Sequence, residues 1–236
     1  MATILNIETS TEVCSVVLAK NGEILFEKES AEGLNHSELL TVFIEELFAE
    51  NNLHMQILDA VAVSKGPGSY TGLRIGVSVA KGLCFALDIP LIAVGTLDAM
   101  GFYASQNAYH HGAASADNML FCPMIDARRM EVYTALFNKN GENVQPVSAE
   151  IIDENSFSSY LIDHKIQFFG NGASKCKHLL NHSNALFKGP SKTSARFMQI
   201  LAEKKYNNNE FENVAYFEPF YLKNFVATIP KNKILK

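Results

Sequence analysis

Three sequence features are missing or scarce in this chain, and each absence excludes a class of protein. The four cysteines lie far apart and form no C-x-x-C pair, so the sequence indicates neither a zinc site nor a thiol redox centre. No apolar run reaches about 18 residues without interruption, as a membrane-spanning helix would require. Lys and Arg number 20 against 25 Asp and Glu, and the net charge of −5 disfavours a protein that binds nucleic acid alone.

The remaining composition is typical of a globular protein. The chain has 236 residues, 47% of them hydrophobic, which is enough for one large domain or two small ones with a substantial core. Three of the cysteines stand among apolar residues and are predicted to be core side chains. Because a strand-like run begins at residue 2, we expect no signal peptide, a cytoplasmic location and no membrane partner.

The C-terminal segment differs in charge from the rest of the chain. From residue 220 to residue 236 it contains no acidic residue and four lysines, Lys223, Lys231, Lys233 and Lys236. A solvated tail is the ordinary interpretation of such a segment, and a contact with phosphate or with an acidic partner is the alternative. The sequence leaves both open.

Hydrophobic periodicity and turn residues predict two successive sets of strands and helices. The first set has strands at 2–7, 13–19, 23–28, 58–64 and 89–94, and helices at 35–50, 72–87 and 96–108. Asn35 is expected to cap its helix, with Glu38 completing a capping box. After a small polar segment at 110–117, the second set has strands at 120–125, 131–137, 143–147 and 166–169, and helices from about 173 and from about 191 to 205.

The two sets share one layout, which indicates an internal duplication. An acid ends the first strand of each set and Asn-Gly joins the next two strands: Glu8 precedes Gly22 by 14 residues, and Asp126 precedes Gly141 by 15. The pattern predicts an α/β fold of two lobes, residues 1–108 and 109–236, each with a mixed sheet and helices. The tail at 207–236 belongs to the second lobe in this scheme, with a return to the first lobe as the alternative.

Five stretches spread over the chain resemble one protein family: "ILNIETST", "LNHSELL", "VSKGPGSYTGLRIGVSVAKGL", "IDARRMEVYTALF" and "EPFYLKNFV". They resemble the TsaB family, also called YeaZ. The resemblance implies the two-lobed fold of actin, hexokinase and Hsp70 (ASKHA). It also implies a non-catalytic, accessory role in making N6-threonylcarbamoyladenosine (t6A) at position 37 of tRNA. The implied partners are a TsaD-type transferase, a TsaE-type ATPase and, through their complex, tRNA, with a homodimer when the chain is alone.

The resemblance further implies that the two first-lobe helices bind the transferase partner. The helix 72–87 agrees with this, because apolar residues occupy most of its circumference instead of one stripe. Its glycines would let a second helix approach closely. The predicted partner-binding residues are His36, Leu39, Leu40, Phe43, Leu73, Ile75, Gly76, Val79, Gly82 and Leu83. The alternative is that both helices are simply buried within the lobe.

The segment "KGPGSYTG", residues 65–72, joins a predicted strand to this helix. A glycine-rich loop before a helix can bind phosphate, but this one lacks the Lys-Ser/Thr of a P-loop. We interpret Gly66, Pro67 and Gly68 as a sharp turn and Ser69 or Thr71 as the helix cap. Ligand binding at the N–H groups of the loop is the less favoured alternative.

A vestigial nucleotide site is the second candidate, because nucleotide phosphates in this superfold lie between two hairpin turns. In the first turn, Glu8 could hold a hydrated cation, and Thr9 and Ser10 could donate hydroxyls; a self-stabilised turn is the equal alternative. The second turn has no glycine, and Arg128 and Arg129 could reach an anion or pair with acids of a partner. We expect no cofactor beyond weak ATP or ADP binding. The rival function is an independent nucleotide-dependent kinase or hydrolase that uses Glu8, Thr9 and Ser10.

Neither a metal site nor a catalytic residue is expected. TsaD-like enzymes are implied to hold a metal with two histidines four residues apart on a helix. His110 and His111 are adjacent in a polar loop, and they are predicted to be surface residues. His36 and His54 are isolated, and His36 is predicted to have a structural or interfacial role. Residues 170–172 weakly resemble an adenine-binding loop, but a simple turn is the favoured interpretation.

Overall fold

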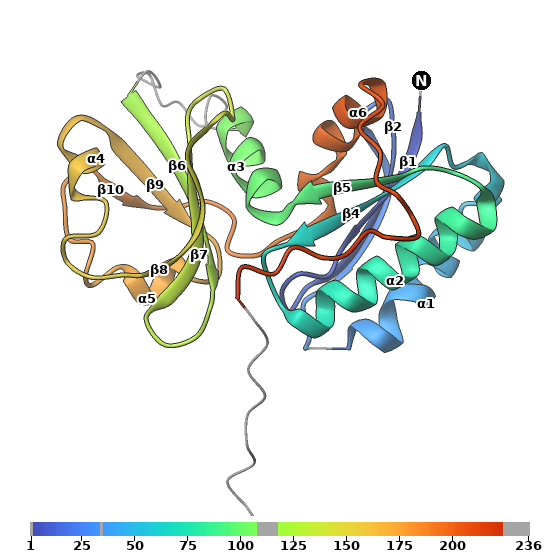
Figure 1. Ribbon diagram of the computed structural model, residues 1–236, viewed down its shortest axis with the longest axis horizontal. Helices are drawn as coiled ribbons and strands as arrows, with labels where there is room; N and C mark the ends of the chain where they lie inside the picture. The colour runs from blue at the N-terminus through green and yellow to red at the C-terminus, as the bar shows by residue number, and fades with distance from the viewer. Residues whose placement is uncertain (1, 34, 108–117, 224–236) are drawn as a thin grey trace, which may run out of the picture.

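The computed structural model describes residues 2–33, 35–107 and 118–223, and it contains two five-stranded sheets (Figure 1). The first sheet has the order β3-β2-β1-β4-β5. Its strands are β1 (Thr3–Glu8), β2 (Cys14–Lys20), β3 (Glu23–Ser30), β4 (Ala60–Gly66) and β5 (Leu91–Gly95). The helices of this half are α1 (His36–Glu50), α2 (Tyr70–Leu87) and α3 (Thr96–Asn107), with a 3-10 turn, η1, at Met55–Ile57.

The second sheet has the order β10-β9-β6-β7-β8. Its strands are β6 (Met119–Asp126), β7 (Glu131–Phe137), β8 (Asn143–Ile151), β9 (Lys165–Phe169) and β10 (Ala185–Phe187). Two short helices, α4 (Ser158–Asp163) and α5 (Ala173–Cys176), belong to this half, and η4 (Ala195–Phe197) and α6 (Gln199–Asn207) follow it.

Both sheets follow the same plan, which confirms the predicted two-lobed α/β fold. In the first, β1, β2 and β3 are antiparallel neighbours, and β4 pairs parallel with β1. In the second, β6, β7 and β8 are antiparallel neighbours, and β9 pairs parallel with β6. The Asn21-Gly22 turn has the positive φ angles, 54° and 75°, that make Asn-Gly the favoured pair in tight hairpins.

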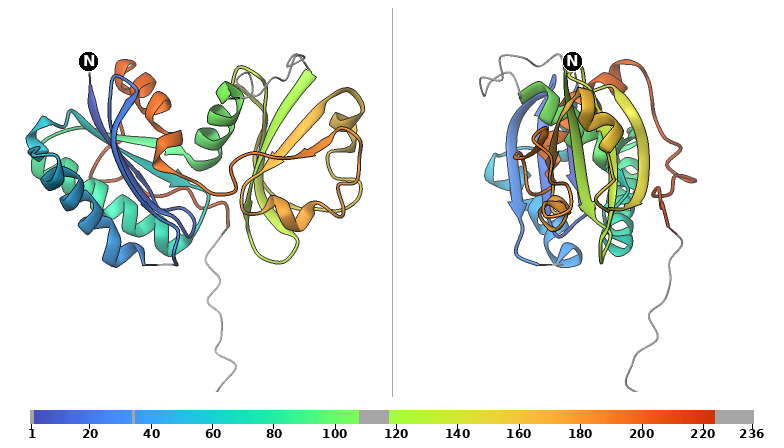
Figure 2. Two further views of the ribbon diagram at one scale, coloured as in Figure 1. Left: turned by 180° about the vertical axis from the view of Figure 1, so that it is seen from behind. Right: turned by 90° about the vertical axis from the view of Figure 1, so that its left-hand side faces the viewer.

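Three apolar cores hold the layers together. One lies between the first sheet and the helices α1 and α2, and another lies on the outer side of the second sheet. The third contains Ile4, Ile92, Met100, Phe121 and Phe137, so it joins residues of both sheets through α3, which lies between them in Figures 1 and 2. The two lobes therefore share one core at their junction.

The chain returns to the first lobe near its C-terminus, and it does so before residue 207. Ala195 packs with Val17 and Ala19 of β2, and Ala202 of α6 joins the shared core. Beyond α6, the segment 212–223 runs along α2 and β5 (Figures 1 and 2). It is fixed by hydrogen bonds from Glu212 N to Leu91 O (2.8 Å) and from Phe220 N to Lys65 O (2.7 Å).

Several local predictions differ from the structure. The helix expected at 191–205 is divided into η4 and α6, because residues 193–194 are extended where they cross between the lobes. The capping box on α1 does not form, since Asn35 makes no side-chain capping bond. The short elements η1, α4 and β10 were not predicted. The predicted loop at 110–117, with His110 and His111, and the tail beyond 223 lie outside the described residues.

Candidate functional site

The first hairpin turn, between β1 and β2, is enclosed by the chain itself. Glu8, Thr9 and Ser10 are each at most 1% exposed, and Thr11 is 6% exposed. One oxygen of Glu8 accepts hydrogen bonds from Ser10 N (2.6 Å) and Ser64 Oγ (3.0 Å). Of the two predictions for this turn, the structure agrees with the self-stabilised one. A nucleotide could touch these side chains only if the turn opened.

The glycine-rich loop before α2 is what covers this turn. Ser69 N donates to Ser10 O (2.6 Å), and Thr9 Oγ1 donates to Gly72 O (2.8 Å). A Cβ atom added at Gly68 would overlap Ser10 O, and one added at Gly72 would overlap Thr9 O. These glycines therefore allow the loop to pack closely against the hairpin, as expected for a structural turn.

The predicted helix cap is confirmed, whereas the predicted use of the α2 glycines is wrong for Gly72 and Gly76 and stays a prediction for Gly82. Ser69 lies at the N-cap and its Oγ accepts from Gly72 N (3.3 Å). We expected the glycines to admit a second helix. Gly72 and Gly76 instead face Thr9 of the same lobe, and only open space surrounds Gly82 within 4 Å.

Glu8 supplies a pH-dependent prediction. Burial raises the pKa of its carboxyl, and hydrogen bonds from Ser10 and Ser64 offset this only in part. A raised folded-state pKa means that the stability contribution is complete below the unfolded-state pKa and is lost as pH rises through the folded-state pKa. We expect Glu8→Gln to be more stable than wild type at neutral pH, by about 1.4 kcal/mol for each unit of raised pKa. The gain should shrink as the pH falls towards 4.5.

Urea unfolding of both proteins at several pH values measures this difference. Glu23→Gln is the matched control, because Glu23 begins β3 and is exposed. Parallel stability profiles for wild type and Glu8→Gln would show that Glu8 does not carry the pH dependence.

The second hairpin turn is exposed, and it does not meet the first in an open site. Arg128 and Arg129 project from the β6–β7 turn and are exposed. Between the two turns, Asn171 donates to Glu12 (3.0 Å) and accepts from Asp126 N (2.9 Å). The segment G170-N-G172 therefore holds the lobes together at the position where the sequence suggested an adenine loop.

His36 has a structural role within the first lobe. His36 is 2% exposed, and its Nε2 lies 3.0 Å from Val13 O, which ties α1 to the first hairpin. The expectation that the chain has no pair of histidines at the metal-binding spacing was wrong, because His178 and His182 are four residues apart. These two follow α5 in turns and do not share a helical face. Within residues 2–33, 35–107 and 118–223, no group of three or more His, Cys, Asp or Glu could hold a metal ion.

All four cysteines are buried and free, which includes the three that were predicted to be core side chains. Burial raises the pKa of the Cys14 and Cys84 thiols to about 11 and that of Cys122 to about 12. Such thiols carry almost no thiolate at neutral pH and are poor nucleophiles.

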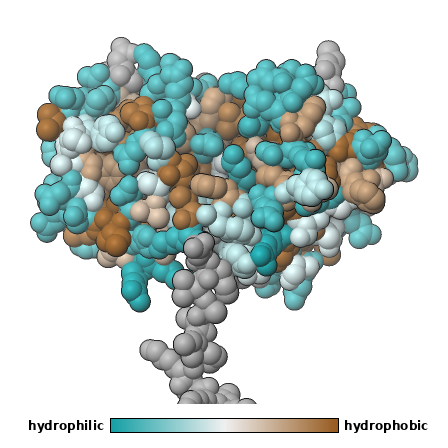
Figure 3. All heavy atoms as spheres, viewed as in Figure 1, coloured by the Kyte–Doolittle hydropathy of each residue, from teal (hydrophilic) through white to brown (hydrophobic). Residues whose placement is uncertain are grey.

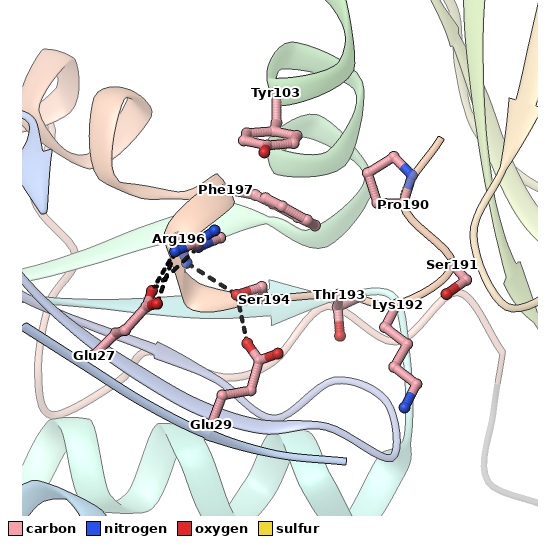
Figure 4. Close-up of a pocket in the computed structure, with 10 residues that line it drawn as sticks. All are labelled: Glu27, Glu29, Tyr103, Pro190, Ser191, Lys192, Thr193, Ser194, Arg196 and Phe197. Carbon is pink, nitrogen blue, oxygen red and sulfur yellow. Dashed lines mark hydrogen bonds and ion pairs between the residues drawn. The ribbon is translucent and has the colours of Figure 1, made fainter. Parts of the chain in front are cut away.

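A cavity of about 480 Å³ lies where the chain crosses back to the first lobe (Figure 4). Arg196 pairs with Glu27 (2.7 Å), and Ser194 Oγ donates to Glu29 (2.6 Å). The ring of Tyr103 lies 4.1 Å from that of Phe197, centroid to centroid. These polar contacts fasten the crossing to β3. This cavity was not predicted, because its lining comes from three segments that are distant in the sequence.

Four of the ten predicted partner-binding residues are enclosed by the lobe and cannot form its surface. His36, Leu40 and Leu73 are at most 2% exposed, and Gly76 is buried against Thr9. The other six lie at the surface: Leu39, Phe43, Ile75, Val79 and Leu83 are half-buried, and Gly82 is exposed. For these six, the partner-binding role stays a prediction.

The duplicated sheet order and the shared core define the class of protein: a two-lobed α/β protein with one mixed sheet in each lobe. A family model described as "TsaD: tRNA N6-adenosine threonylcarbamoyltransferase" matches residues 30–231. The chain is 32% identical to the tRNA threonylcarbamoyladenosine biosynthesis protein TsaB of Haemophilus influenzae, over 95% of each chain. It is 37% identical to the Bacillus subtilis protein of that name over 61% of this chain and 60% of the other.

A solved structure gives the same result. YeaZ from Pseudomonas aeruginosa superposes with a TM-score of 0.73 and 27% identity, covering 94% of this chain and all of the other. The chain belongs to the TsaB family, also called YeaZ, as the five stretches predicted. Among the described residues, no helix combines the length and the apolar character needed to span a bilayer.

Proposed function

We propose that this protein is a non-catalytic accessory subunit in the synthesis of t6A in tRNA, and that it binds a TsaD-type transferase through the outer face of α1 and α2. Its relatives in H. influenzae and B. subtilis are named as proteins of t6A biosynthesis. The family model that spans both lobes is described as the transferase itself, so the partner would share this fold. A TsaE-type ATPase and tRNA would join the complex, and a homodimer would form when the partner is absent.

The carrying observation is that one apolar face of α2 is only partly covered. A first face, with Val77 and Cys84, packs in the core beneath the helix. A second face is covered by the C-terminal segment, since Lys81 donates to Ala215 O and Phe217 O, both at 3.1 Å. The remaining face lies beside α1, and it is half-buried at Ile75 and Val79 and exposed at Gly82.

Helix α1 extends this apolar face. Leu39 and Phe43 are half-buried beside it, and Val42 is 43% exposed. On the side of the molecule drawn in Figure 3, hydrophobic residues lie in patches among polar ones. Apolar side chains on two packed helices suit a helical partner surface, where apolar anchors at spacings of three and four insert together.

The enclosed first turn supports a role without catalysis. An ASKHA enzyme would need Glu8, Thr9 and Ser10 to reach a nucleotide, and here those groups bond to their own lobe. No contact of the structure favours the rival, an independent kinase or hydrolase. Calorimetry with ATP and Mg²⁺ would support that rival if tight binding and turnover occurred without partners.

The interface test uses a charged double variant, Ile75→Glu/Val79→Glu, whose two like charges on one face of α2 cannot neutralise each other. Both side chains are half-buried, so the charges can reach solvent in the free protein but would be trapped in the complex. We expect at least about tenfold weaker association with the TsaD-type partner, since a single desolvated, unpaired charge costs more than about 1.4 kcal/mol. Size-exclusion chromatography and calorimetry of the mixed full chains measure it.

Ile162→Glu is the matched control, because Ile162 is 73% exposed on α4 of the other lobe. It should leave association unchanged. A wild-type chain that forms no complex would refute the proposed function. A complex that tolerates the double variant would refute the interface.

A further inference from the structure

The β6–β7 turn has long side chains at positions where the backbone conformation favours glycine or asparagine. Arg128 and Arg129 have φ angles of 73° and 51°, and the turn is closed by Ala127 N to Glu131 O (3.1 Å) and Glu131 N to Arg128 O (3.1 Å). Two successive positive φ angles favour Asn-Gly and disfavour long side chains. In the shorter turn between β2 and β3, the residues with positive φ angles are Asn21 and Gly22. Residues held against their backbone preference often serve a function that the fold alone does not explain.

The two arginines are also left without partners. Two carboxylates flank the turn, but each is taken by a lysine: Asp126 pairs with Lys175 (2.5 Å), and Glu131 pairs with Lys223. Among the described residues, neither guanidinium makes an ion pair or a side-chain hydrogen bond. Because the neighbouring acids are already neutralised, the turn presents two full positive charges to solvent.

We propose that Arg128 and Arg129 form a contact site for the phosphodiester backbone of RNA. The proposal rests on the proposed function, which places the chain in a complex that acts on tRNA. Paired exposed guanidinium groups suit phosphate oxygens, which they can bind through two parallel hydrogen bonds. A convex turn tip can lie against a sugar–phosphate backbone without reading its sequence.

The charge of the adjoining chain favours RNA over an acidic protein. Lys223 contacts Glu131, two residues after the turn, so the C-terminal segment leaves the described structure beside the arginines. From residue 220 to the end, the sequence carries only positive charges. The protein as a whole is acidic, so we do not expect it to bind RNA alone. The two arginines would instead strengthen the RNA binding of the complex.

The experiment measures tRNA binding by the complex of the full chain with its TsaD-type counterpart. Fluorescence anisotropy with an unmodified tRNA transcript, at salt from about 50 to 200 mM, gives the slope of log affinity against log salt concentration. In Arg128→Ala/Arg129→Ala, we expect weaker binding and a slope that is shallower by about 2, about one for each lost phosphate contact.

Lys20→Ala/Lys165→Ala is the matched control and should keep the wild-type slope. Lys20 ends β2 and Lys165 begins β9, so both lie at the strand ends opposite the two turns. A second variant, Arg128→Asn/Arg129→Gly, gives the turn its preferred residues. It should melt at a higher temperature than wild type, and its salt-dependence slope should be shallower by the same amount as in the alanine variant. Such a result would show that the weaker RNA binding comes from the lost contact and not from misfolding.

Two results would overturn the RNA site. One is an unchanged slope in an intact complex. The other is weaker binding to the transferase in the absence of tRNA, which would assign the arginines to an acidic protein surface. If the wild-type complex itself fails to form, the proposed function is refuted instead, and tRNA binding by the chain alone then decides whether the arginines contact RNA.

Discussion

Replacing Gly72 with valine is expected to lower the free energy of unfolding by about 3 kcal/mol, at the upper end of the usual cost of overpacking a core. A Cβ at this position would overlap the carbonyl oxygen of Thr9, and the side-chain hydroxyl of Thr9 is bonded to the carbonyl of Gly72. The obstructing atom belongs to the backbone, so it cannot rotate away. The hairpin and the N-terminus of α2 would have to separate.

Gly82→Ala is the informative control, because it adds a methyl group to the same helix where nothing lies within 4 Å. It should raise stability by about 0.5–1 kcal/mol, the ordinary gain when alanine replaces glycine in a helix. Chemical denaturation of the three proteins compares them directly. If Gly72→Val were as stable as wild type, the loop would not be packed against the first hairpin as described.

The fold was largely predictable because its signals are local. The hairpins are marked by Asn-Gly at residues 21–22 and 140–141, and the helices by apolar residues at spacings of three and four. The duplication was predicted because the same pattern, an acid that ends the first strand and an Asn-Gly turn between the next two, occurs twice. The elements that were not predicted include α4 and β10, which have six and three residues. Elements this short have too few residues to show a hydrophobic period.

The candidate site was less predictable because it depends on distant contacts. Glu8, Thr9 and Ser10 form a polar turn, and nothing in their neighbourhood indicates that residues 66–72 will bury them. Hydrophobic periodicity likewise showed that α2 is apolar over more of its circumference than one core-facing stripe. It could not show which part of the protein covers each face. That assignment required the return of residues 212–223, which cover one side of the helix. The burial of His36 and Gly76 also depends on distant contacts, because His36 bonds to Val13 and Gly76 lies against Thr9.

Phe137→Ala is expected to lower the free energy of unfolding by about 3–5 kcal/mol and to weaken the coupling between the lobes. Phe137 belongs to β7 of the second lobe and is 1% exposed. Its ring fills the space beside Gly101 of α3, within the core that both sheets share. Truncation therefore leaves a cavity at the junction between the lobes. The surrounding structure can fill this cavity only if α3 moves.

Phe168→Ala separates this effect from simple loss of a buried ring. Phe168 is 0% exposed, but it packs within the second lobe against Phe157 and Phe187. Both variants should be destabilised to a similar degree. Only Phe137→Ala should increase hydrogen exchange in α3 and β5 under native conditions, because local opening follows the contacts that are lost. Equal exchange patterns in the two variants would show that the shared core does not couple the lobes. The outcome bears on function, because an interface on the first lobe and an RNA contact on the second can act together only if the lobes hold a fixed arrangement.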